Sequence, residues 1–210
     1  IGQIHYTGRI MMTYLPVYKH TYQSEVNTAR LPETAGAVRK GTSGIERFEI
    51  TVKDAEGKLL SDAIPVVSIV KDGGYSGLEI GDDPSIETDL IASIDQKLGL
   101  GRLAGFIFEG LVPYGIPTSE ARRRVMLRAA MCGLPVVRVG RGKPQGWADY
   151  DPYHISGANL TATKARLLLM ACLMKFGSLP AASDPDNPTA AELSATAAAV
   201  EAYQVIFDTH

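Results

Sequence analysis

One stretch of the chain, residues 134–176, constrains the fold more than any other part of the sequence. It opens with a short, largely β-branched apolar run at 134–139, and a glycine-rich loop follows at 140–147. A short apolar run with Gly and Pro at its ends is typical of a strand buried in a parallel sheet. The segment from residue 156 onward predicts a strongly apolar helix that reaches residue 176. The glycine-rich loop would then lie at the carboxyl end of the strand, where open α/β sheets bind their ligands.

The same alternation of strand and helix extends through most of the chain after residue 64. Two further buried strands are expected, at 65–70 and at 103–108. Amphipathic or capped helices are expected at 84–98, at 118–131 and from residue 189, where Thr and Glu stand at capping-box spacing. We therefore predict an α/β fold, with a small parallel sheet and helices on both of its faces.

The first part of the chain differs in character from the rest. Residues 1–44 are rich in Thr, Tyr, Gly and Pro and show no helical period, so we expect them to lean on another part of the protein. Gly36, Gly41 and Gly44 are expected to mark turns, and residues 45–52 to form a strand. The predicted fold thus begins with an extended strand and loop segment that belongs to a partner domain. Because the first residue is Ile1 rather than Met, we expect a fragment or one chain of a split protein.

The composition narrows the classes of function. The 210 residues are 45% hydrophobic and 21% charged, which is ordinary for a soluble globular protein. A net charge of −2 gives no electrostatic reason to expect binding to nucleic acid or to an anionic membrane. No run reaches the roughly 18 apolar residues of a membrane span. Cys132 and Cys172 lie in apolar helical runs, so we predict buried free thiols, a reducing compartment and a cytoplasmic location.

We predict neither a metal site nor a bound cofactor. None of the four histidines stands at metal-ligand spacing from another His, a Cys or a carboxylate. The sequence contains no Gly-x-Ser-x-Gly elbow and no P-loop lysine motif. Gly140-Arg141-Gly142 resembles the start of a dinucleotide fingerprint, but the third glycine and the helix that it should open are missing.

Two further candidate functional residues are a lysine in a polar segment with aromatic neighbours and a tyrosine between Pro113 and Gly115. Lys19 is either a solvated surface lysine or a lysine desolvated among Tyr18, His20 and nearby residues. In the second case it would lose proton affinity and could help to activate a hydroxyl or a water. Tyr114 could form a hydrogen-bonding wall of a pocket or could be a turn aromatic.

Two carboxylates follow predicted strands. Glu109 and Asp149 could each stabilise a loop or contact a ligand at the carboxyl edge of the sheet. Four arginines of the helix expected at 118–131 are predicted to form its solvated face. They are Arg122, Arg123, Arg124 and Arg128.

Several segments resemble the bacterial L-asparaginase family. Residues 134–138, then Arg141 and then 159–170 resemble the carboxyl-terminal domain of that family, in which such a helix start follows a glycine-rich segment. Upstream, residues 4–9 and 19–21 resemble the family's strand, its Gly-Arg turn and its lysine-containing segment. The resemblance spans nearly the whole chain, and the helix motif is its most specific part.

The resemblance implies an amidohydrolase built from two α/β domains. Residues 1–60 would be the end of the amino-terminal domain with its linker, and residues 61–210 the carboxyl-terminal domain. The family's nucleophilic threonine lies in a Gly-Gly-Thr motif, and a second, Thr-Asp-rich motif follows it. Neither motif is present here, so the nucleophile is expected on a missing segment or on a partner chain. By resemblance, Lys19 matches the family's catalytic lysine, although direct counting from the Gly-Arg turn would place Thr13 there.

The family also builds its active site between neighbouring subunits, which implies an oligomer. The neighbour's polar residues would correspond to 113–115 and 147–149, so Tyr114 and Asp149 become expected substrate contacts. Glu109 is a third, because the loops 109–114 and 146–149 would close the pocket. The family's usual Asn and Glu are not found at these positions, so a plain L-asparagine substrate does not follow. We therefore expect one part of an asparaginase-like amidohydrolase acting on a small amide. The alternative is a non-catalytic ligand-binding or regulatory subunit with the same fold.

Overall fold

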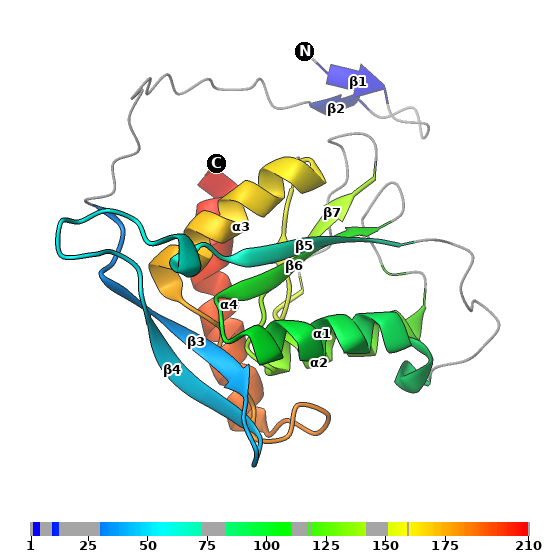
Figure 1. The fold of residues 1–210 in the computed structure, drawn as a ribbon. Coiled ribbons are helices and arrows are strands. Elements are labelled where there is room, and N and C mark those ends of the chain that lie inside the picture. The colour runs from blue at the N-terminus through cyan, green and yellow to red at the C-terminus, as the bar shows by residue number, and fades with distance from the viewer. Residues whose placement is uncertain are drawn as a thin grey trace.

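The chain has the predicted α/β fold, which is a parallel sheet covered by helices, together with an antiparallel hairpin (Figure 1). The structure is a computed structural model. It describes residues 2–4, 10–12, 30–72, 83–110, 117, 119–141, 151–158 and 160–209.

Four parallel strands form the central sheet, and their order in space follows their order in sequence. The strand β6 is buried on both faces, as the middle of a parallel sheet requires, and this explains its continuous apolar run. The four strands are β5 (Val66–Lys71), β6 (Ala104–Gly110), β7 (Val136–Gly140) and β8 (Ile155–Ser156).

Alternate residues of β6 separate the two faces of the sheet. Phe106 and Phe108 pack with buried residues of α1 and α2, whereas Ile107 packs on the opposite face with residues of α3 and α4. Each face therefore has its own apolar core, and the molecule has three layers with the sheet in the middle. The helices are α1 (Thr88–Leu100), α2 (Glu120–Met131), α3 (Ala162–Phe176) and α4 (Ala190–Thr209).

The antiparallel hairpin of β3 (Thr34–Lys40) and β4 (Ile45–Thr51) packs near the carboxyl-terminal ends of α1 and α3, which is the amino edge of the central sheet (Figure 1). The sequence predicted β4 but not β3. Gly36 lies inside β3 rather than in a turn, so that prediction was wrong. A Cβ atom at Gly177 would lie 2.6 Å from the carbonyl oxygen of Gly36, so the glycine at 177 permits this close approach, whereas a Cβ atom at Gly36 would meet nothing within 4 Å.

Two other boundaries differ from the predictions. The helix expected from residue 84 begins as the short 3₁₀ helix η3 (Pro84–Ile86), and α1 starts only at Thr88. The segment from residue 156, which we expected to open a helix, starts as strand β8, and α3 begins after the cap Thr161. The remaining short elements are β1 (Gly2–Ile4), β2 (Ile10–Met12) and η2 (Ser61–Ala63).

Both cysteines are buried, as predicted, and burial raises the pKa of each thiol to about 11. Such thiols are poor nucleophiles at neutral pH, because the reactive thiolate is scarce. Within the part of the chain that the structure describes, none of the helices combines the length and the hydrophobicity needed to span a membrane.

Candidate functional site

Charged side chains converge at the carboxyl edge of the sheet, where β5, β6 and β7 end. We name this group the carboxyl-edge network. It joins strand ends to the first turn of α2 and to the residue before α1, so distant parts of the sequence meet there. Its members are Asp72, Glu87, Glu109, Arg122 and Arg141.

One half of the network surrounds a fully buried carboxylate. Asp72 follows β5 directly, and its side chain is 0% exposed. Arg122, on α2, donates from Nη1 to Asp72 and from Nε to Glu87 at 2.9 Å. A buried carboxylate without a cation would carry a large desolvation cost, so this arrangement holds all three groups in place.

The position of Arg122 corrects the prediction of a solvated helix face. Its side chain is only 11% exposed, whereas those of Arg123 and Arg124 are 53% and 55% exposed. The cap of α2 sets this geometry, because the Ser119 hydroxyl accepts a hydrogen bond from the backbone N–H of Arg122 at 3.2 Å.

The other half of the network ties three strand ends together through Arg141. Its backbone N–H donates to the carbonyl of Gly110 at 3.0 Å, at the end of β6. Its Nη2 donates to the backbone oxygen of Asp72, and its Nε donates to Glu109 Oε1 at 3.3 Å. The guanidinium is therefore fixed from two sides, yet the side chain remains 37% exposed.

Of the four predicted site residues, the structure describes Glu109. This residue lies within β6 rather than in the loop after it, and its side chain is 15% exposed. Glu109 stands beside the strand ends, where we predicted a ligand edge, and it holds Arg141. Lys19, Tyr114 and Asp149 lie outside the described residues, as does Thr13.

A second buried polar group, which the sequence analysis missed, lies between β7 and β8. Arg138 in β7 is 3.6 Å from Asp151 Oδ2, and His154 Nδ1 is 2.9 Å from the same oxygen. Because an ionised carboxylate only accepts hydrogen bonds, Nδ1 of His154 is the donor. Two features of the sequence could have indicated this group. Arg138 stands in a run expected to be a buried strand, and Asp151 and His154 follow it three residues apart.

The surroundings of Asp151 favour its ionised form. Burial by itself would raise the pKa of this carboxyl. The contacts with His154, the backbone N–H of Tyr153 and the charge of Arg138 outweigh burial and lower the pKa to about 2. Among the described residues, the buried Nε2 of His154 has no hydrogen-bond partner.

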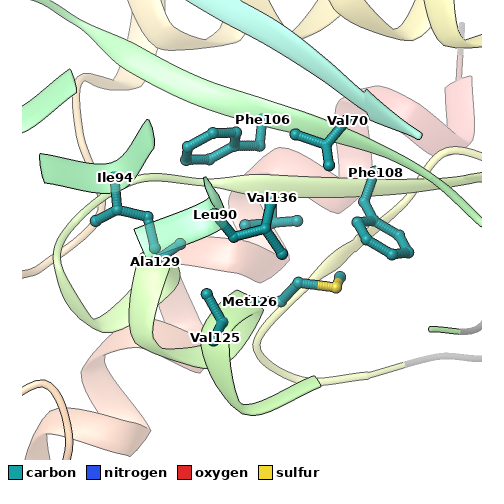
Figure 2. A pocket seen from close by; sticks show the side chains of 9 residues that line it. All are labelled: Val70, Leu90, Ile94, Phe106, Phe108, Val125, Met126, Ala129 and Val136. Carbon is teal, nitrogen blue, oxygen red and sulfur yellow. The ribbon is translucent and has the colours of Figure 1, made fainter. Parts of the chain in front are cut away.

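A small cavity lies between the sheet and the helices α1 and α2, and only apolar side chains line it (Figure 2). Its volume is about 20 Å³, roughly that of one water molecule. With no polar group to hold a water or to orient a substrate, the cavity is a packing gap between aromatic and aliphatic side chains, and it is not a ligand site. Its lining includes Phe106, Phe108, Val125 and Met126.

The described side chains bring together no three His, Cys, Asp or Glu residues that could hold a metal ion. The carboxyl-edge network instead offers fixed cations and carboxylates, which can bind and orient polar groups of a ligand. No protein-family model matches this chain, and no curated protein sequence matches it.

Proposed function

We propose that this chain is one part of an asparaginase-like amidohydrolase, either its carboxyl-terminal portion or its second chain. The observation that supports this most directly is the carboxyl-edge network, which lies where parallel sheets bind ligands. The resemblance of 134–138, Arg141 and 159–170 to the asparaginase family supplies the class of reaction.

In the proposed reaction, a threonine from another segment or chain attacks the carbonyl carbon of a small amide. Backbone N–H groups stabilise the oxyanion of the tetrahedral intermediate, and the protonated nitrogen leaves as ammonia or an amine. Water then cleaves the ester on the threonine and releases a carboxylate. Lys19 would tune the proton relay during the attack.

The described residues would contribute a rigid floor to the cleft. Pairing of Asp72 with Arg122, and of Glu109 with Arg141, fixes charged groups on strand and helix ends rather than on a free loop. A binding group held in this way stays close to its productive geometry without a further loss of side-chain entropy.

The test is to purify the tagged chain from its native cells and to identify any companion by intact mass and sequencing. We expect a companion with a Gly-Gly-Thr motif, and ammonia release from a panel that includes L-asparagine, L-glutamine and other small amides. The 210-residue chain alone should release none. Full activity of the isolated chain would overturn the proposed division of labour.

A lysine variant separates an enzyme from a binding module. In the assembled protein, Lys19→Ala should lower turnover by more than about 100-fold, the low end of a general-base effect. Lys164→Ala on the exposed side of α3 is the control and should leave turnover unchanged. An assembled protein that hydrolyses no amide of the panel would favour the non-catalytic alternative.

A further inference from the structure

We propose that Arg141 forms a binding site for a singly charged carboxylate group at the carboxyl edge of the sheet. The ligand would be a small molecule with one carboxylate, which is either the substrate or the acid released from the amide. The site is inferred from the geometry alone, whereas its assignment to substrate or product rests on the proposed function.

Arg141 has more hydrogen-bond donors than its contacts in the network use. A guanidinium group has five N–H donors and no acceptor. Arg141 uses one on Glu109 and one on the backbone oxygen of Asp72. Three donors, on Nη1 and Nη2, have no partner among the described residues, and the side chain is 37% exposed.

The guanidinium group of Arg141 is already held in position before a ligand arrives. Its two side-chain hydrogen bonds end on different strands, one on Glu109 of β6 and one on the residue after β5. By contrast, Arg122 is 11% exposed and bonded to two carboxylates, so it has little capacity for a ligand. Arg141 is therefore the cation of the network that can meet a ligand without first losing its own contacts.

The charge of the network favours a ligand group with a single negative charge. The network combines three carboxylates with two guanidinium groups, a formal charge of −1. Glu109 would repel a doubly charged phosphate more strongly than a singly charged carboxylate. A planar carboxylate also matches the flat fork of the remaining guanidinium donors and can accept two parallel hydrogen bonds.

Binding can be measured on the whole chain, without a partner, by NMR of the arginine side-chain N–H groups. The probes are N-acetyl-L-alanine, its neutral methylamide and inorganic phosphate. We expect a saturable shift of the Arg141 signal with N-acetyl-L-alanine and none with the methylamide. Equal responses to the acid and the methylamide, or tighter binding of phosphate, would overturn the assignment. This comparison needs no variant.

Variants then locate the site. Arg141→Gln should weaken carboxylate binding by about 10-fold or more, because charged hydrogen bonds are lost, and Arg141→Lys should fall between the two. Arg123→Gln, which changes an exposed arginine of α2, should leave binding unchanged. Unaltered affinity in Arg141→Gln would refute the proposal.

Kinetic assays of the assembled protein show whether the bound carboxylate belongs to the substrate or to the released acid. If the substrate carries it, Arg141→Gln raises KM for amides with a free carboxylate and leaves amides with a capped carboxylate unchanged. If the product carries it, the variant relieves inhibition by the released acid. Absence of any amide hydrolysis would defeat the proposed function while leaving the binding result on the isolated chain intact.

Discussion

A buried cation lies at each edge of the sheet, but the groups that surround the two cations differ. At the carboxyl edge, Arg122 lies between Asp72 and Glu87, so its charge is matched by carboxylates. At the amino edge, Lys97 is only 3% exposed, and it meets the carbonyl oxygen of Val66 and the ring of Phe106. Burial, with a smaller contribution from Arg166, lowers the pKa of Lys97 to about 8.

This difference indicates what each edge does. The amino edge is closed by the hairpin, and its buried lysine meets a dipole and an aromatic face, so this edge serves packing. The carboxyl edge carries opposite charges in fixed positions, and one guanidinium there has donors left over. A surface built to bind polar ligands has the second character rather than the first.

The largest expected effect comes from removing the buried carboxylate of the carboxyl edge. Asp72→Asn leaves Arg122 buried with one of its two carboxylate partners, and breaking a buried pair typically costs about 3 kcal/mol or more of unfolding free energy. Urea denaturation followed by circular dichroism measures this loss. The matched control is Asp62→Asn, since Asp62 is 88% exposed in its pair with Arg102 and should cost less than about 0.5 kcal/mol. Equal losses in both variants would contradict the contrast between buried and exposed pairs.

Asp151, the carboxylate beside Arg138 and His154, tests whether a second carboxylate paired with a buried cation also stabilises the fold. Its folded pKa, about 2, lies below the ordinary value of 3.8, so the ionised form stabilises the fold. That contribution is present above pH 3.8 and is lost as the pH falls toward 2. Asp151→Asn should therefore lower stability at pH 7 by about 1–2 kcal/mol, with a smaller deficit near pH 2. A deficit that does not change with pH would show that the ionised carboxylate, with its contacts to His154, the backbone of Tyr153 and Arg138, is not its source.

Lys97 should make stability rise with pH as well, but at alkaline pH and because the fold favours the neutral form of this side chain. Its folded pKa of about 8 is below the ordinary 10.5, so the unfolded chain holds the proton more tightly than the folded chain between these values. Stability should then rise as the pH increases from about 8 to 10.5, by up to about 2 kcal/mol. Lys97→Met keeps the length of the side chain and should remove this rise relative to the wild type. Parallel stability curves for the two proteins would contradict a desolvated lysine at the amino edge.

The sequence predicted the parts of the fold that depend on local chemistry. The apolar runs became β5, β6 and β7, and α2 begins after the side-chain cap Ser119, within the range 118–131 expected for this helix. The capping box at the start of α4 also forms, since Glu192 accepts from the Thr189 backbone N–H at 2.7 Å. These features can be predicted from the sequence because each depends on residues within one turn or one strand.

What escaped prediction depends on contacts between distant residues. Arg122 looks like its exposed neighbours in the sequence, and only Asp72, fifty residues earlier, gives it a buried role. Strand β8 has two residues and no apolar run of its own, so only its pairing with β7 defines it. The donors of Arg141 likewise become visible once the ends of β5 and β6 are placed beside it.

The smallest expected effect separates a stabilising cap from a cap that also serves the site. Ser119→Ala and Thr189→Ala should each cost about 1 kcal/mol of unfolding free energy, because each removes a side-chain cap at a helix start.

The effects of these two variants on carboxylate binding should differ. Loss of the Ser119 cap loosens the turn that holds Arg122 against Asp72, whose backbone oxygen in turn holds Arg141. Ser119→Ala should therefore weaken N-acetyl-L-alanine binding by a few-fold, and Ser119→Asp, which keeps a capping oxygen, should restore it, whereas Thr189→Ala should not change it. If both alanine variants bound the carboxylate equally well, the cap of α2 would have no part in positioning Arg141, and the carboxyl edge would differ from the amino edge in charge alone.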